Sequence, residues 1–218
     1  MTHAEAFDAQ LRLSLGRDRL IGVDEAGRGP LAGPVVVAAV RLGWGSREEL
    51  RDVRDSKRLT PLAREKLYES ILKAAEAVSI SWAHPRQIER LNILGATLLS
   101  MRRAALRLAT DDDCAVVVDG DKLIPNLGVR QMAIVDGDDL SLAIGCASVV
   151  AKVFRDRWMA RLEKRFPGYG FARHKGYGTE EHVAALRKLG PCAVHRRTYE
   201  PVSALLAPLT SSEESSAA

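Results

Sequence analysis

Residues 20–42 read LIGVDEAGRGPLAGPVVVAAVRL, and this stretch decides the fold. An apolar run at 20–23 ends in the acidic pair Asp24 and Glu25, and a turn rich in glycine and proline leads into a valine-rich run at 35–42. Short apolar runs bounded by glycine and proline are typical of buried β-strands. The stretch therefore predicts two strands, with two carboxylates where the first one ends.

The rest of the chain alternates strand patterns with helix patterns. Further strands are expected at 78–83, 115–119 and 129–135. Helices are expected near 61–77, from Asn92 to about 108, over 140–166, and after the capping residue Thr179. This alternation predicts an α/β protein with a mixed central sheet flanked by helices and a helical C-terminal region.

The length of 218 residues suits one domain, because a chain of this size buries most of its apolar surface in a single core. We expect this domain to span residues 1–202. Residues 203–218 are rich in serine, glutamate and alanine, which is too little apolar matter to order them, so a mobile tail is expected there.

Composition argues against several classes of protein. The three cysteines, Cys114, Cys146 and Cys192, are odd in number and lack the C-x-x-C spacing of a zinc site or disulfide framework. No apolar run approaches the length of a membrane span, and the first twenty residues do not resemble a secretion signal. We therefore expect a cytoplasmic protein that does not associate with membranes.

Positive charge is concentrated in the C-terminal part of the domain, at about 152–202. The formal net charge is only +4, but residues 152–197 contain 12 lysines and arginines against 4 aspartates and glutamates. Such a run usually only solvates a helix surface. Next to clustered carboxylates, it favours a surface that follows a phosphate backbone.

The carboxylates themselves indicate metal-dependent chemistry. Asp119 ends the almost wholly apolar run at 115–119, so pairing of the strands would bring it close to Asp24 and Glu25. A divalent cation such as Mg²⁺ neutralises such a cluster and favours phosphoryl chemistry. Each acidic residue taken alone is more often an ordinary strand end.

The glycines at 27–32 also loosely match a dinucleotide-binding loop. This interpretation is rejected because a strand, not a helix, is expected to follow the glycines.

At this point the sequence resembles the ribonuclease HII family, in order, from about residue 20 to residue 201. The matching motifs are DEAGRGPLAGPV at 24–35, DSKRL at 55–59, LNILxAT at 91–97, VDG at 118–120, GD at 137–138, ASVVAKVxRD at 147–156, YGFAxHKGY at 169–177 and HRR at 195–197. Eight motifs that occur in the same order along the chain argue against a chance resemblance.

The resemblance implies a ribonuclease H-like fold and two divalent ions, Mg²⁺ or Mn²⁺, held by Asp24, Glu25, Asp119 and Asp138. One ion would activate water and the other would stabilise the departing 3′ oxygen, leaving 5′-phosphate and 3′-hydroxyl ends. This chain departs from the family at Asp136, where a lysine is usual. Asp136 would change the local electrostatics or the metal affinity, and Asp121 would be an outer neighbour; the sequence does not choose between these effects.

The resemblance also implies a substrate: the RNA strand of RNA/DNA hybrids, and duplex DNA nicked 5′ to single embedded ribonucleotides. Backbone groups of Gly27, Arg28 and Gly29 would lie near the 2′-hydroxyl, with Tyr177 beside the same ribose. The residues expected to contact phosphates are Arg28, Lys57, Lys152 and Lys175. His174 and His195 receive no role, and Cys146 is expected to pack in the core.

Two alternatives to this function remain at the level of sequence. The first is another nuclease on the same fold, such as a junction resolvase, against which Gly27, Arg28, Gly29 and Tyr177 argue. The second is a duplex-binding protein without catalysis, which would not need the three carboxylates together. A monomer is expected, and a sliding clamp or polymerase partner stays open, although no residue indicates one.

Overall fold

The computed structural model describes residues 2–43, 48–53 and 59–206. A five-stranded sheet runs through its centre in the order β3-β2-β1-β4-β5. The strands are β1 (Arg19–Ala26), β2 (Val35–Leu42), β3 (Ala77–Ala83), β4 (Cys114–Asp119) and β5 (Gln131–Ile134). β1 pairs antiparallel with β2 and parallel with β4, so the sheet is mixed, as the sequence predicts.

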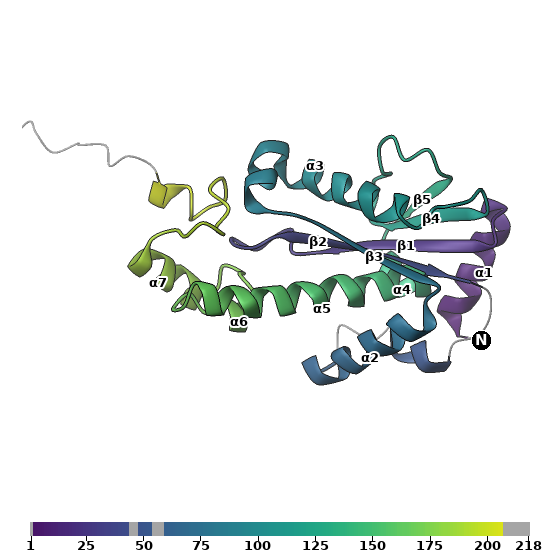
Figure 1. The fold of residues 1–218 in the computed structure, drawn as a ribbon, viewed down its shortest axis with the longest axis horizontal. Helices are drawn as coiled ribbons and strands as arrows, with labels where there is room; N and C mark the ends of the chain where they lie inside the picture. The colour runs from purple at the N-terminus through teal and green to yellow at the C-terminus, as the bar shows by residue number, and fades with distance from the viewer. Residues whose placement is uncertain (1, 44–47, 54–58, 207–218) are drawn as a thin grey trace, which may run out of the picture.

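Helices cover both faces of the sheet. They are α1 (His3–Leu15), α2 (Pro61–Ala74), α3 (Pro85–Leu106), α4 (Gly137–Leu140), α5 (Leu142–Arg165), α6 (Phe171–His174) and α7 (Glu180–Leu189), with 3-10 helices η1 (Glu48–Val53) and η3 (Ala204–Leu206). In Figure 1, α3 lies above the sheet, α5 lies along the lower face and α2 lies outside α5. The α6, α7 and η3 elements extend from one end of the molecule.

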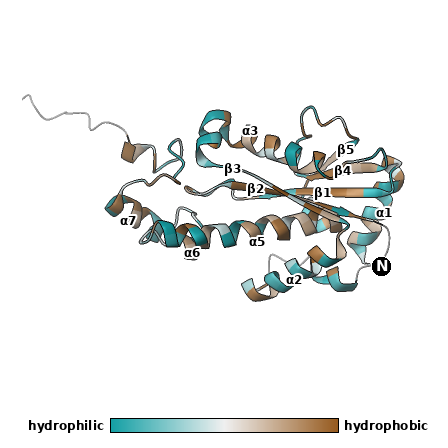
Figure 2. Cartoon of the chain, in the orientation of Figure 1, coloured by the Kyte–Doolittle hydropathy of each residue, from teal (hydrophilic) through white to brown (hydrophobic). Residues whose placement is uncertain are grey.

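Alternation along β1 separates two buried clusters. Leu20 packs on the α5 side with Ala143 and Ile144, whereas Ile21 and Val23 pack on the α3 side. Asp24 shares the α5 side with Leu20 because it lies an even number of residues away. Figure 2 shows apolar colours on the strands and on the part of α5 beneath them, and more polar colours where α5 approaches α6.

The contact between β1 and α5 depends on a missing side chain. A methyl group on Gly22 would lie 2.1 Å from the backbone carbonyl of Ala143. Only glycine allows this approach, which brings the beginning of α5 against the middle of β1. This contact fixes α5 relative to the strand that carries Asp24.

Several predicted boundaries differ in the structure. The helix expected from Asn92 begins seven residues earlier, at Pro85. Asn92 nevertheless marks an interruption: its φ is 56°, and its side chain accepts a hydrogen bond from Gly95 N at 2.9 Å, which restarts the helix. The helix expected over 140–166 is divided at Ser141, whose hydroxyl caps α5.

Helix α1 is absent from the expectations, although Thr2 and Glu5 form a capping box at its start. At the other end of the chain, the predicted tail overlaps η3, and residues 207–218 lie outside the described residues. Within the described ranges, no helix is long and apolar enough to cross a membrane.

Candidate active site

Three carboxylates meet where β1 and β4 end. These strands are parallel and Val23 pairs with Val118, so Asp24 and Asp119 follow as the next residue of each strand. Asp24 is only 5% exposed, and its Oδ1 accepts a hydrogen bond from Glu25 N at 2.6 Å. The Ser148 hydroxyl, from α5, also bonds to Asp24.

Burial makes the negative charges in this group costly. Desolvation raises the pKa of Asp24 well above its usual value, and the charges of Glu25 and Asp119 raise it further. Burial also raises the pKa of Glu25, but Arg28 partly offsets this because its guanidinium lies 3.4 Å from Glu25 Oε1. A bound cation would remove the repulsion between these carboxylates.

Asp138 approaches from a neighbouring element. Asp119 Oδ1 accepts a hydrogen bond from Gly137 N at 2.8 Å, and this bond ties the start of α4 to the end of β4. A methyl group on Gly137 would lie 2.7 Å from Ile144 Cδ1 and 3.2 Å from Asp119 Oδ1, so these side chains would have to shift to admit it. Asp138, the residue after Gly137, lines a small hollow of about 70 Å³ together with residues of α1, η1 and the start of α5.

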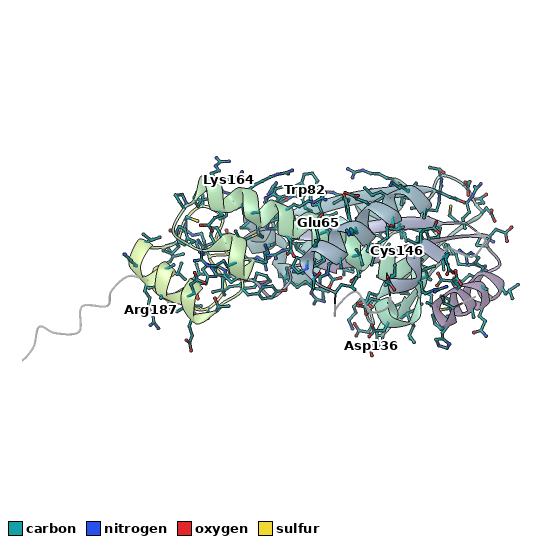
Figure 3. All side chains as sticks on the ribbon, turned by 90° about the horizontal axis from the view of Figure 1, so that it is seen from below. Glu65, Trp82, Asp136, Cys146, Lys164 and Arg187 are labelled. Carbon is teal, nitrogen blue, oxygen red and sulfur yellow. The ribbon has the colours of Figure 1, made fainter. Side chains whose placement is uncertain are left out.

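Two further aspartates, Asp136 and Asp121, lie close in sequence to the predicted ligands Asp138 and Asp119, and both are on the surface. Asp136 has a left-handed φ of 54° at the start of α4, and Figure 3 shows it at the rim of the molecule. Asp121 is paired with Lys122 at 2.9 Å. Each lies two residues before or after a predicted ligand, on an exposed turn.

The donor atoms fit a hard divalent cation. Within the described ranges, no three His, Cys, Asp or Glu side chains already converge on one cation position. The set is nevertheless composed of carboxylates, which are the ligands that Mg²⁺ and Mn²⁺ prefer. It is also buried and self-repelling, so binding a cation would relieve an electrostatic cost that this structure shows.

A cleft of about 330 Å³ opens beside these carboxylates. It brings together four residues predicted from the sequence: Glu25, Gly27, Lys152 and Tyr177. Three further polar residues line the same cleft and were not predicted as site residues: Arg64, Ser148 and Arg155. Ser148 and Arg155 lie within the motif ASVVAKVxRD at 147–156. Arg64, on α2, lies in none of the motifs, so the sequence gives no signal for its place in the cleft.

Two buried arginines hold the loop that follows β1. Arg196 donates to the carbonyls of Gly27 at 2.5 Å and Arg28 at 2.6 Å, and also to Gly33. Arg155 donates to Pro34 O at 3.1 Å and leaves no space for a side chain on Gly27. Burial lowers the pKa of Arg155 to about 10 and also lowers that of Arg196.

Tyr177 faces this loop from the segment between α6 and α7. Its ring is 46% exposed, and the Arg155 guanidinium lies 5.9 Å from the ring centroid. A methyl group on Gly29 would touch the ring at 3.9 Å. The structure therefore brings Tyr177 together with Gly27 and Gly29, as the resemblance implies.

The predicted phosphate contacts are spread more widely. Lys152 pairs with Asp156 at 2.8 Å beside the cleft. Lys175 lines a neighbouring cleft of about 220 Å³, shared with Arg64 and Arg157. Arg28 is half exposed, and Lys57 lies outside the described residues.

Cys146 is buried between α5 and the sheet, in agreement with its expected packing role. His195 is also buried, and it contacts His182 rather than any of the carboxylates described above.

Comparison with known proteins gives one consistent result. A family model described as Ribonuclease HII matches residues 21–202. The Ribonuclease HII of Polaromonas sp. is 51% identical over 189 residues, covering 86% of this chain and 92% of that protein. An RNase HII from Archaeoglobus fulgidus, solved in complex with PCNA, is 27% identical with a TM-score of 0.70, covering 83% and 95% of the two chains. A Bst-RNase HIII solved with Mn²⁺ shares the fold, with a TM-score of 0.71 at 20% identity and 89% and 71% coverage.

Proposed function

The chain belongs to the ribonuclease HII family and is a ribonuclease H endonuclease; we propose that Asp24, Glu25, Asp119 and Asp138 hold its catalytic metal ions. Enzymes of this family depend on divalent metals. The observation that carries the proposal is the burial of Asp24 beside two other carboxylates, which raises its pKa and leaves a cluster that a cation would stabilise.

When bound, two divalent ions would activate water and stabilise the departing 3′ oxygen, which yields 5′-phosphate and 3′-hydroxyl ends. The chain's own residues hold the carboxylates in position. Gly137 N and the Ser148 hydroxyl each hold one carboxylate through a hydrogen bond, so Asp119 and Asp24 keep their places before any ion arrives. Mg²⁺ and Mn²⁺ are both candidates.

The substrate that fits this site is a duplex containing ribonucleotides. The family acts on RNA/DNA substrates, and we assign to this chain both the RNA strand of hybrids and single ribonucleotides in DNA. The carbonyls of Gly27 and Arg28 are bound by Arg196, so the other polar groups of this loop can serve a ribose in the cleft. Tyr177 lies across the cleft, where it would pack on the same ribose.

Phosphate contacts would come from Arg28, Lys57, Lys152 and Lys175. Arg64 joins this set because it lines both clefts. Such contacts supply affinity that weakens with salt and carries little information about base sequence.

We further propose that the protein works in the cytoplasm as a monomer. The archaeal relative solved with PCNA makes a sliding clamp a candidate partner for this chain as well. Size-exclusion chromatography with light scattering would test the monomer, and co-elution with the organism's own clamp would test the partner.

The first experiment is cleavage of a labelled DNA duplex that contains one ribonucleotide. An all-DNA duplex and an RNA/DNA hybrid serve as comparison substrates, with Mg²⁺, Mn²⁺ or EDTA in parallel. Cutting 5′ to the ribonucleotide with either metal, and loss of cutting in Asp119→Asn, is the expected result. Unchanged cutting by Asp119→Asn would refute the metal assignment, and cutting of the hybrid alone would refute the single-ribonucleotide activity.

A further inference from the structure

Three histidines pack together beneath the segment that carries Tyr177. The rings of His174 and His182 stack with centroids 4.4 Å apart, and His182 Nε2 lies 3.1 Å from His195 Nε2. His182 and His195 are at most 1% exposed. None of the three has a role in the chemistry proposed above, so their arrangement needs a separate explanation.

Their hydrogen bonds define one arrangement of protons. His182 Nδ1 must donate to Tyr177 O at 2.8 Å, because a carbonyl only accepts. In a neutral ring, His182 Nε2 is then an acceptor, so His195 Nε2 must be the donor between the two. His195 Nδ1 accepts from Cys192 N at 3.0 Å, which agrees with this assignment.

His174 completes the set. Its Nε2 donates to Tyr169 O at 2.7 Å, and its Nδ1 accepts from Gly176 N at 3.1 Å. Each ring nitrogen of the three histidines therefore has a partner while every ring is neutral. Burial supports this state, because it lowers the pKa of His182 and lowers that of His195 to about 4.

These bonds hold the backbone on either side of the Tyr177 side chain. His174 binds the Gly176 amide, and His182 binds the Tyr177 carbonyl. The turn before Tyr177 needs this support, because Lys175, which is not a glycine, has a left-handed φ of 54°. Gly176 O also accepts a hydrogen bond from Leu31 N at 2.8 Å, which connects the turn to the loop that follows β1.

We propose that His182 is a positioning residue for Tyr177: His195 keeps its Nδ1 protonated, and His182 in turn fixes the backbone that presents the tyrosine ring to the ribose. This inference rests on the proposed contact between Tyr177 and the ribose. It assigns to α7 a share in substrate selection, although the helix supplies none of the residues that line the catalytic cleft.

The test is a double-mutant cycle on the single-ribonucleotide duplex. His182→Leu removes the bond to Tyr177 O and should lower kcat/KM about 10- to 100-fold, as expected for a misplaced contact. In a Tyr177→Ala background, the same change should cost less than about threefold, because there is no ring left to position. His182→Asn keeps a donor near the Nδ1 position and should retain activity within about threefold of the parent.

Leu108→Ala is the control for general destabilisation, because Leu108 is buried on the α3 side of the sheet, away from the cleft. At a temperature where the variants are folded, it should leave kcat/KM unchanged. If His182→Leu fails to fold, His195→Leu takes its place in the cycle, because it removes the group that fixes the His182 tautomer.

Two failures are distinguishable. Equal losses from His182→Leu with and without Tyr177 would overturn the positioning role while leaving the ribose contact in place. Full activity of Tyr177→Ala alone would refute the ribose contact itself, and the inference with it.

Discussion

Asp24 is held in a place that suits a metal site better than it suits the stability of the fold. Its carboxylate is buried beside two others, and only Ser148 and the Glu25 amide compensate within the described contacts. Residues with such raised pKa values are concentrated at functional sites, because a purely structural position would favour a neutral side chain.

Replacing Asp24 by asparagine should therefore stabilise the protein in EDTA while abolishing cleavage. The pKa of Asp24 is raised in the folded state, so its contribution to stability is present below about pH 3.8 and is lost as the pH rises through the folded-state value. We expect Asp24→Asn to exceed the parent by about 0.5–2 kcal/mol at pH 8, with a smaller gap at pH 5. Thermal unfolding in EDTA at both pH values measures this, and a variant less stable than the parent at pH 8 would contradict it.

Asp136 stands where the resemblance to ribonuclease HII implies a lysine. It is exposed at the start of α4, two residues before Asp138. A negative charge at Asp136 favours cation binding nearby, and screening by dissolved salt limits this gain in affinity. Asp136→Lys should raise the Mg²⁺ concentration for half-maximal cleavage about two- to fivefold at low salt, with Asp136→Asn intermediate. Identical metal titrations for all three proteins would show that Asp136 is only a surface residue.

At the scale of elements, the packing of α5 on β1 positions the proposed catalytic groups. The helix supplies Ser148 to Asp24 and Arg155 to the loop after β1. Both placements depend on the close approach at Gly22, where no side chain fits. This contact between a helix and a strand therefore sets where Ser148 and Arg155 lie in the cleft.

Gly22→Ala should disturb this contact. The added methyl group meets the backbone of Ala143, which cannot rotate away, so we expect a loss of about 1–3 kcal/mol in the free energy of unfolding. Activity should fall further than stability explains, because Ser148 moves with α5. Gly95→Ala is the control: its methyl group would make an ordinary contact, 3.6 Å from Leu91 Cβ, so the change should stabilise the protein by about 0.5–1 kcal/mol. Denaturant unfolding of both variants provides the comparison, and equal stabilities would exclude a special role for Gly22.

Elements with strong local signals could be predicted from the sequence. The strand at 35–42 agrees with β2, since an unbroken valine-rich run between proline and glycine leaves little choice. Boundaries that depend on tertiary contacts could not be predicted. Helix α3 continues back to Pro85 because Ile88 is buried against Val35 and Ala83, and α1 is ordered where Asp8 accepts a hydrogen bond from Ala143 N.

The same division applies to the candidate site. Asp24, Glu25 and Asp119 were predictable because each ends an apolar strand. The role of the arginines was not, because the motifs that contain Arg155 and Arg196 do not reveal that these side chains are buried and bind the loop after β1. Arg64 became a candidate only when the structure placed it beside both clefts.

At the scale of the whole molecule, the distribution of charge should govern substrate affinity. The net charge is +4, while residues 152–197 carry an excess of eight positive charges, so the remainder of the chain is acidic. Repulsion from the acidic part and attraction by the basic part both favour one orientation of a duplex.

Binding of the substrate should therefore weaken steeply with salt. Lys152→Gln should reduce the slope of log Kd against log salt by about one, because one phosphate contact is lost. Lys73→Gln, at the end of α2, should leave the slope unchanged. Anisotropy titrations with Ca²⁺ in place of a catalytic metal would measure both slopes, and equal slopes for Lys152→Gln and the parent would remove Lys152 from the interface.

Helix α5 runs without a break for 24 residues, from the end beside the carboxylates to the basic end near α6 (Figure 1). A helix of that length measures about 36 Å, which is close to one full turn of a nucleic acid duplex at about 3.4 Å per step. Because α5 is continuous, the number of its residues fixes the distance between the carboxylates near its start and the basic side chains at its end. The enzyme's footprint on a duplex should accordingly be a constant of the protein, whatever the sequence or length of the nucleic acid it meets.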